Sequence, residues 1–291
     1  MGDTAHRKAS SQEWLFKYRG ISYPKMRCSL DTFEALQDFV ARRDDMMLVS
    51  YPKCGTNWCL QILNDLAATV SASEEMKRNF DILEFGAADK YKKMETLPSP
   101  RVYATHLHHD NLPKDVIQNG TKKLVIFRNP KDTAVSLFHF HSKNPAVHTY
   151  NDWDEYFSEF ISGNVVWGSY FDHAVIWNKH IEDENVMIIT YEDLKENLAG
   201  GVQKIAEFFG LSLTEEQIRL IAERATFDRM KERSLETHGG FGQILFRKGD
   251  VGDWKNYFSE AQNREMDAKF EECLARTKLG KMMMYDMHCK Y

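Results

Sequence analysis

The stretch MMLVSYPKCGTNWCLQILNDLAATV, Met46 to Val70, contains the pattern that decides the fold. An apolar run, Met46 to Ser50, is followed by a polar turn and then by apolar residues at helical spacing. The same order recurs where KKLVIF leads through Asn129-Pro130 into DTAVSLFHF, and where VMIIT leads into YEDLKENLAGGVQKIAEFFG. Short β-rich runs that alternate with longer helical patterns predict an α/β fold, with a central parallel sheet and helices on both faces.

Length and composition limit the classes of protein that fit the chain. It has 291 residues, of which 43% are hydrophobic, and nothing in it looks like a linker. We therefore expect one domain over residues 1–291, with residues 1–12 as a flexible N-terminal tail. The net charge of -5 argues against nucleic acid as a partner, because phosphate backbones select strongly basic surfaces. Any anion-binding site must therefore be local.

The cysteines and the apolar runs bear on the compartment. The five cysteines are scattered and form no CxxC pair, which is typical of free thiols in a reducing compartment. The N-terminal segment MGDTAHRKASSQ lacks the apolar centre of a signal peptide, and no run approaches the ~18 apolar residues of a membrane span. We expect a cytoplasmic protein with no membrane partner.

The loop YPKCGTNW, Tyr51 to Trp58, joins a predicted strand to a predicted helix. In parallel sheets, ligands bind at the carboxyl ends of the strands, where such loops lie. Gly55 frees the backbone amides, the following helix contributes its N-terminus, and Lys53 adds a positive charge. These features predict a cradle for a phosphate or sulfate group. The alternative is a tight turn with a solvated lysine, and the loop is not a Walker A motif because its lysine precedes the glycine.

Two further segments carry positive charge near predicted strand ends or glycines. Arg128 ends its strand, and Ser136 lies about two turns into the next helix, so both can face one anion. In RKGDVGDWK, Arg247 to Lys255, glycines permit an irregular backbone beside two cationic side chains. Taken alone, Arg128 and Ser136 fit an ordinary surface arginine with an unrelated serine as well as they fit an anion site. The segment RKGDVGDWK, taken alone, fits a flexible basic loop.

The stretch THLHHD, Thr105 to Asp110, allows three interpretations. His106 follows a predicted strand, and an imidazole there can act as a general base near neutral pH. Alternatively, His106, His108 and Asp110 match the HxHxD part of a metallo-hydrolase motif, although Asn111 stands where that motif has a further histidine. A zinc site also needs ligands from elsewhere. The third interpretation is a loop of partly exposed histidines, and we expect no metal.

The motifs YPKCGTNW, THL, FRNPKDTAVS, ITYEDL and RKGDVGDWK occur in this order. In this respect the chain resembles the cytosolic sulfotransferase family, and within it the 6B branch, over nearly its full length. The resemblance implies a single α/β domain that moves a sulfuryl group from 3'-phosphoadenosine 5'-phosphosulfate (PAPS) to a small lipophilic acceptor. The acceptor would present a hydroxyl or an amine, the other product would be 3'-phosphoadenosine 5'-phosphate (PAP), and no metal would be required.

The resemblance also assigns roles to residues of this chain. His106 would accept the acceptor's proton, Lys53 would neutralise the bridging oxygen, and both would form the catalytic set with Ser136. The 5' end of the donor would contact Lys53, Cys54, Gly55, Thr56 and Asn57. The 3'-phosphate and nucleoside would contact Trp58, Arg128, Ser136, Tyr191, Thr226, Phe227, Arg247, Lys248 and Gly249. Phe140 would form a wall of the acceptor pocket, which Phe80 and Phe85 would border.

Several positions depart from the family's usual pattern. The chain reads CGTN where SGTT is common, so Cys54 would contribute its backbone amide and Asn57 a side-chain hydrogen bond. Ala104 replaces a lysine before the histidine, which puts the rate and acceptor preference in question. The usual dimer motif is altered at Glu260 and Arg264, so dimerisation cannot be assumed. A donor-binding or lipophile-binding protein without turnover therefore stays open, as does a metal-dependent hydrolase.

Overall fold

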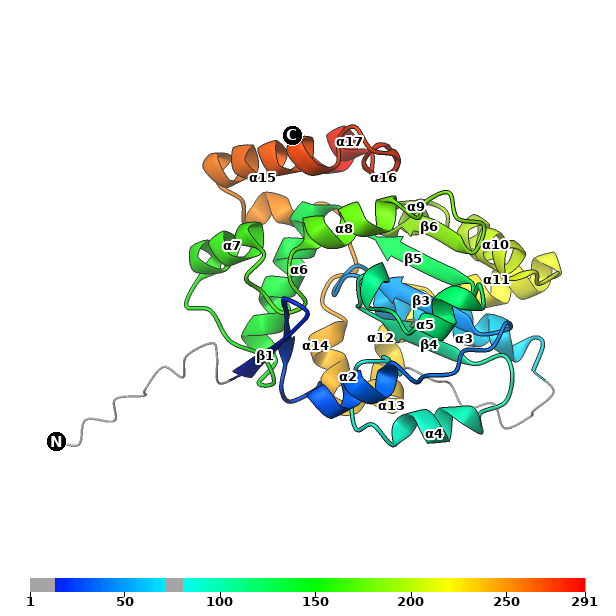
Figure 1. Ribbon diagram of the computed structural model, residues 1–291. Coiled ribbons are helices and arrows are strands. Elements are labelled where there is room, and N and C mark those ends of the chain that lie inside the picture. Colours follow the sequence, from blue (N-terminus) through cyan, green and yellow to red (C-terminus); the bar gives the residue numbers. More distant parts are fainter. Residues whose placement is uncertain (1–13, 72–80, 291) are drawn as a thin grey trace.

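A central sheet of four parallel strands organises the computed structural model, which describes residues 14–71 and 81–290 (Figure 1). The strand order is β4–β3–β5–β6, with bounds β3 Met46–Ser50, β4 Val102–Thr105, β5 Lys123–Phe127 and β6 Val186–Thr190. In register, Leu48 of β3 lies opposite Ala104 on one side and Leu124 on the other. The predicted α/β class with a parallel sheet is confirmed.

Helices cover both faces of the sheet, and the residues of each strand alternate between two apolar clusters. Leu48 and Ile126 belong to the cluster under α3 (Thr56–Ala68), α10 (Leu198–Phe209) and α11 (Glu215–Arg224). The side chains of Val49 and Val125 belong to the opposite cluster. That second face is covered by helices α2 Leu30–Leu36, α6 Pro130–Lys143, α7 Trp153–Ser162 and α8 Tyr170–Asn178. Burial on both faces explains why these strands are almost continuously apolar.

The chain reverses from strand to helix at one edge of the sheet, where local signals fix each helix start. At α6 the side-chain oxygen of Asn129 accepts a hydrogen bond of 2.8 Å from the backbone N–H of Asp132, and Pro130 occupies the first turn. The helical pattern after β6 is divided into α9 (Tyr191–Glu196) and α10. Asn197 causes the division, because its φ of -140° is not helical and its side chain caps α10.

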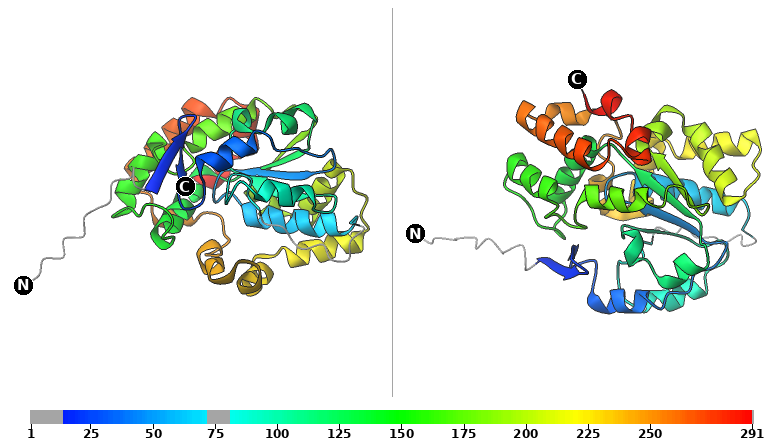
Figure 2. Two further views of the ribbon diagram at one scale, coloured as in Figure 1. Left: turned by 60° about the horizontal axis from the view of Figure 1, so that its bottom comes forward. Right: turned by 45° about the horizontal axis from the view of Figure 1, so that its top comes forward.

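The remaining elements surround this α/β core. The antiparallel hairpin β1–β2 was not predicted from the sequence. Figure 2 shows the gold segment α12–α14 apart from the orange and red C-terminal helices. These elements are β1 Leu15–Tyr18, β2 Ile21–Pro24, α4 Lys90–Glu95, η1 His109–Asn111, α5 Lys114–Gln118, α12 Phe227–Glu232, α13 Ser234–His238, η2 Gly239–Phe241, α14 Gly242–Leu245, η3 Asp253–Asn256, α15 Glu260–Cys273, α16 Lys278–Met282 and α17 Tyr285–Cys289.

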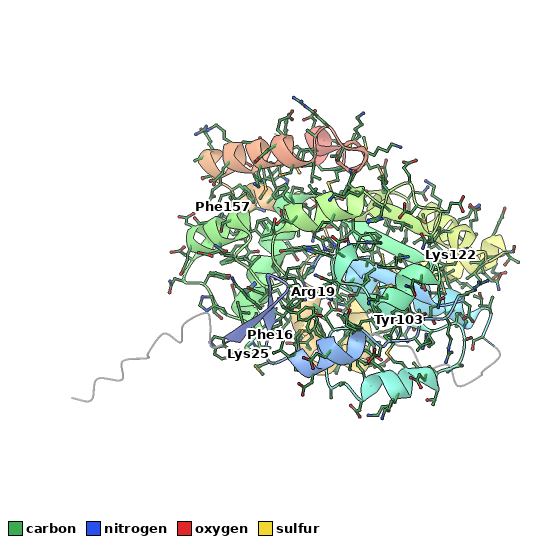
Figure 3. All side chains as sticks on the ribbon, viewed as in Figure 1. Phe16, Arg19, Lys25, Tyr103, Lys122 and Phe157 are labelled. Atoms are coloured by element: carbon green, nitrogen blue, oxygen red, sulfur yellow. The ribbon has the colours of Figure 1, made fainter. Side chains whose placement is uncertain are left out.

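Side chains fill the space between the sheet and its helices (Figure 3). Tyr103, labelled there on β4, is fully buried and donates to the Asp45 carboxylate at 2.9 Å. The guanidinium of Arg101 also donates to Asp45, through Nε at 2.7 Å. Because a buried charge is tolerated only when it is paired and hydrogen-bonded, this group fixes the start of β4 and so the position of the residues after it.

Candidate active site

A cavity of about 630 Å³ opens at the carboxyl ends of the four parallel strands. Its lining includes Lys53 after β3, His106 after β4, Arg128 after β5 and Tyr191 after β6. The predicted residues that line the cavity are Lys53, Gly55, Thr56, Asn57, Trp58, His106, Arg128, Ser136, Phe140, Tyr191, Thr226, Phe227, Arg247, Lys248 and Gly249. The structure thus brings together every predicted site residue except Cys54, which does not line the cavity.

The loop after β3 has the backbone that an anion cradle needs. Lys53 has a φ of 71° and Gly55 a φ of 118°, which turns the chain sharply into α3. A Cβ atom on Gly55 would lie 2.9 Å from Cδ1 of Ile126 and 3.3 Å from Cδ2 of Tyr191, so only glycine fits. The side chain of Cys54 is buried, with its Sγ 3.6 Å from Oγ1 of Thr133. This agrees with a purely backbone contribution from Cys54.

Positive charge gathers in the cavity around Lys53 and Arg128. Burial and the charges of Arg128 and Arg247 lower the pKa of Lys53 to about 7. The guanidinium of Arg128 lies 4.5 Å from the ring centroid of Tyr191 and donates to the carbonyl oxygen of Asp250 at 2.8 Å. Within the described part of the chain, no group accepts the buried Nε–H of Arg128. An anion in the cavity would relieve both the repulsion and this unpaired donor.

The basic loop after α14 is held by one carboxylate. Arg247 and Lys248 both donate to Asp253, at 2.5 Å each. Burial alone would raise the pKa of Asp253, but the hydrogen bonds from Lys248 and Arg247 lower it to about 2. Asp253 therefore keeps the two cations at the cavity wall without cancelling the charge of the whole loop.

A flat recess lies beside this loop. Gly249 has a φ of 71°, and a Cβ atom there would lie 2.2 Å from Cδ2 of Phe227, so the glycine backbone lies directly against the ring. Trp58 also lines the cavity. Its indole N–H donates to the carbonyl oxygen of Ala225 at 2.7 Å, and its ring contacts that of Tyr191 edge-on. Two aromatic walls and a glycine without a side chain make a recess that suits a planar ring.

The hydrogen bonds of His106 fix its tautomer. Its Nδ1 lies 2.8 Å from the carbonyl oxygen of Ser50, which can only accept, so Nδ1 carries the proton and Nε2 keeps its lone pair. Burial lowers the pKa of His106, which favours this neutral form. The backbone N–H of His106 and the hydroxyl of Thr105 both donate to the buried carboxylate of Glu84 at 2.7 Å. A base with a free lone pair is thereby held rigidly at the cavity.

The end of the cavity beside His106 is apolar and aromatic. The imidazole contacts the rings of Trp167 and Phe85, with centroids 5.3 and 6.0 Å away. Phe140 is buried on α6, with its ring centroid 5.1 Å from Nζ of Lys53. Phe85 and Phe140 were predicted at this wall, whereas Phe80 lies outside the described residues. A lipophilic molecule here would meet His106 and Lys53 together.

Three residues of the site were not predicted from the sequence. Glu84 supports His106, Trp167 forms the apolar wall, and His238 lines the cavity with Nε2 3.2 Å from Oδ1 of Asn57. The single carboxylate within the apolar run Ile82 to Phe85 was the available signal for Glu84. Trp167 and His238 had no comparable signal, because each reaches the site from a distant part of the chain.

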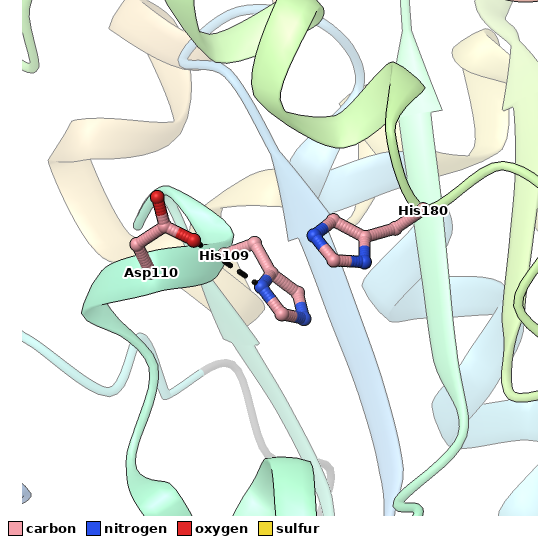
Figure 4. Close-up of side chains that lie close together, drawn as sticks. All are labelled: His109, Asp110 and His180. Carbon is pink, nitrogen blue, oxygen red and sulfur yellow. Dashed lines mark ion pairs between the residues drawn. The ribbon is translucent and has the colours of Figure 1, made fainter.

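The alternative of a metal site depended on His106, His108 and Asp110. Among the residues that the structure describes, the potential ligand atoms of these three side chains do not form a cluster. His106 bonds Ser50, whereas the ring of His108 lies edge-on to that of His173. A different trio, His109, Asp110 and His180, places potential ligand atoms within 4.8 Å of one another (Figure 4). Its two imidazoles stack 3.5 Å apart in planes only 20° apart, so their in-plane lone pairs do not converge as tetrahedral ligation requires.

A family model described as "Sulfotransferase domain" matches residues 43–278. The chain therefore belongs to the sulfotransferase family, and its class of enzyme is that of a sulfotransferase. It is 54% identical to Sulfotransferase 6B1 of Homo sapiens, over 95% of this chain and 91% of that protein. Against Sulfotransferase 6B1 of Danio rerio the identity is 47%, over 97% of this chain and 96% of that protein. The predicted family and its 6B branch are confirmed.

Solved structures show the same fold. The crystal structure of mouse sulfotransferase SULT7A1 complexed with PAP has a TM-score of 0.84 at 33% identity, covering 93% of this chain and 98% of that one. Retinol dehydratase in a complex with retinol and PAP has a TM-score of 0.73 at 21% identity, covering 89% of both chains, and supports the fold alone. None of the helices within residues 14–71 and 81–290 is long and apolar enough for a membrane crossing.

Proposed function

We propose that the protein transfers the sulfuryl group of PAPS to a hydroxyl or amine of a small lipophilic acceptor in the cytoplasm. One observation carries the proposal: a single cavity joins the anion cradle at Lys53 to the free Nε2 of His106 and to an aromatic wall. The mouse relative of 33% identity that was solved with PAP supports this donor. Because the net charge is -5, nucleic acid is not expected as a partner.

The residues of the cavity fit the donor. The unpaired Nε–H of Arg128 suits the 3'-phosphate, with Ser136 and the basic loop beside it. The recess beside Phe227 and Gly249 suits the nucleoside, together with Trp58, Tyr191 and Thr226. The 5' end would lie on the N-terminus of α3, against the side chains of Lys53, Thr56 and Asn57 and the backbone amides of Cys54 and Gly55.

The bound donor supplies the sulfuryl group, whose bond to the 5'-phosphate oxygen breaks as a bond to the acceptor's oxygen or nitrogen forms. Nε2 of His106 accepts the proton that the acceptor loses. The ammonium of Lys53 neutralises the negative charge that develops on the departing phosphate oxygen. Positive charge from Lys53, Arg128 and Arg247 leaves no step that requires a metal ion.

The acceptor class follows from the wall beside His106. Phe85, Phe140 and Trp167 offer aromatic surface, and His106 and Lys53 are polar groups that contact these rings. An apolar body with one nucleophilic group therefore fits better than a polar metabolite. Ala104 does not alter the wall, because it is fully buried in the cluster under α3 and does not line the cavity.

An acceptor-panel assay with radiolabelled PAPS tests the proposal. Phenols, steroids, aliphatic alcohols and aromatic amines are offered in turn, and label in the product is measured. We expect transfer to at least one lipophilic class, and none to the same compounds with the hydroxyl O-methylated or the amine N,N-dimethylated. PAP binding without transfer to any class would instead support a binding protein without turnover.

A further inference from the structure

The side chains of His238 and Asn57 meet at the donor end of the cavity. Nε2 of His238, at the end of α13, lies 3.2 Å from Oδ1 of Asn57, in the first turn of α3. Both residues line the cavity, although 181 positions separate them in the chain. Asn57 lies two residues after Gly55, so this contact lies at the predicted position of the 5'-phosphosulfate.

Contacts with Thr237, Phe246 and Asn57 help to hold the imidazole of His238 in this orientation. Nδ1 lies 2.7 Å from the hydroxyl of Thr237, the ring lies edge-on to Phe246 at 5.7 Å, and Nε2 faces Asn57. Oδ1 of Asn57 can only accept, so this contact is a hydrogen bond when Nε2 carries a proton. In the neutral ring with a proton on Nε2, the single hydroxyl proton of Thr237 turns to Nδ1 at 2.7 Å rather than to the carbonyl oxygen of Arg233 at 3.1 Å.

An asparagine side chain offers both an acceptor and a donor, and an anion needs only the donor. When His238 occupies Oδ1, the amide plane is fixed and Nδ2 remains for a ligand in the cavity. Without His238, the amide can rotate by 180° and present its oxygen, which repels an anion. We infer that His238 is a positioning residue that orients Asn57 so that its amide N–H donates to the 5'-phosphosulfate of the donor.

This inference rests on the proposed function and adds a requirement for this chain's own residue at position 57. A threonine there would offer a hydroxyl close to the backbone, with one atom less reach toward His238. Its hydroxyl rotates freely and needs no partner to face the anion. The need for His238 should therefore exist only while residue 57 is asparagine.

Calorimetric titration with PAP and with adenosine 3'-monophosphate provides the test. His238→Ala should weaken PAP binding about tenfold, because a charge-assisted hydrogen bond is lost. Binding of adenosine 3'-monophosphate should not change, since that nucleotide lacks the 5'-phosphate. His238→Gln retains an N–H at the position of Nε2 and should restore PAP affinity, whereas His238→Asn, which retains only the Nδ1 position, should not.

A second background separates positioning from a general structural role. In the Asn57→Thr protein, adding His238→Ala should leave PAP affinity unchanged within about twofold. Glu236→Ala, an exposed change on the same helix, is the matched control and should behave as the parent protein. Thermal unfolding of every variant verifies that the fold is retained.

The outcomes distinguish this inference from the proposed function. Failure of the parent protein to bind PAP would overturn both. Normal PAP binding by the parent with no loss in His238→Ala would overturn the positioning role alone. An equal loss for PAP and adenosine 3'-monophosphate, or the same loss in the Asn57→Thr background, would also overturn it, because either result indicates a packing role.

Discussion

Nδ1 of His106 donates a hydrogen bond of 2.8 Å to the carbonyl oxygen of Ser50, the last residue of the neighbouring strand. Because that oxygen can only accept, the other ring nitrogen is left as the acceptor that a general base needs. The parallel pairing of β3 and β4 places Val49 opposite Thr105, so the residues after them lie side by side. The sheet itself therefore selects the tautomer of His106.

Replacement of His106 by alanine should separate chemistry from binding. Turnover should fall by about a hundredfold to ten-thousandfold, the usual contribution of a positioned general base. PAP affinity should stay near that of the parent, because the Lys53 loop and Arg128 are intact. Steady-state rates with one phenolic acceptor and calorimetry with PAP check both expectations. Near-parental turnover where chemistry limits the rate would contradict the role and redirect attention to His108 or His109.

Arg128→Ala should remove the preference for a 3'-phosphate. The parent protein should bind PAP far more tightly than adenosine 5'-monophosphate, and the variant should lose about tenfold to a hundredfold of PAP affinity. The reason is the guanidinium of Arg128, which lines the cavity and whose buried Nε–H has no acceptor within the described residues. Arg219→Ala, an exposed arginine on α11, is the matched control. Equal affinity of the parent for both nucleotides would defeat the assignment.

The affinity for PAP should depend on pH through Lys53. Burial, with the charges of Arg128 and Arg247, lowers the pKa of Lys53 to about 7, so the free protein carries a charged lysine below pH 7 and a neutral one above it. An anion binds the charged form, so PAP affinity should fall as pH rises from 7 to 9, by up to about tenfold per pH unit. Lys53→Ala should weaken both binding and transfer.

Calorimetry in buffers with different ionisation enthalpies checks this coupling, because binding above pH 7 should take up a proton. Lys53→Arg is the matched control, since arginine stays charged and should remove the pH dependence over this range. His106 does not interfere, because its lowered pKa keeps it neutral there. A parent protein with pH-independent affinity and no proton uptake would show that Lys53 does not meet the donor.

The local parts of the fold and site could be predicted from the sequence. Lys53, His106, Arg128 and Tyr191 each follow a short apolar run, and parallel strands necessarily bring such positions to one edge. The break at Asn197 could not be predicted by periodicity, because apolar spacing continues across it and only the side-chain cap on Gly200 reveals the division.

The partners of the predicted residues could not be found in the same way. Glu84, Trp167 and His238 contact the site from segments whose approach depends on tertiary packing, and no local pattern encodes it. The tautomer of His106 could not be predicted from the sequence either, because it depends on the register of two strands more than fifty residues apart. The sequence thus predicted the groups that line the cavity better than the groups that orient them.

Dimerisation through the start of α15 should be weak or absent. Glu260 and Arg264 lie one turn apart at 3.7 Å, with side chains 93% and 73% exposed. A two-fold interface uses the same patch twice, so burying this segment would desolvate both charges in both copies. Light scattering should give the mass of a monomer, and Glu260→Arg should not change it. A tight dimer that Glu260→Arg dissociates would overturn this prediction.

Gly249→Ala should damage the nucleoside recess, and Gly252→Ala provides a matched control for backbone strain. Both glycines have positive φ, 71° and 91°, so alanine at either position costs about 1–2 kcal/mol of folding stability. Only at Gly249 would the new methyl carbon lie 2.2 Å from the Phe227 ring, whereas at Gly252 nothing lies within 4 Å. Phe227 must then move into the space that we assign to the nucleoside.

We expect Gly249→Ala to bind PAP about tenfold more weakly than Gly252→Ala, since overpacking by one methyl costs about 1–3 kcal/mol. Calorimetry with PAP and chemical denaturation of both variants provide the measurements, and equal PAP affinities would show that the recess beside Phe227 does not hold the nucleoside.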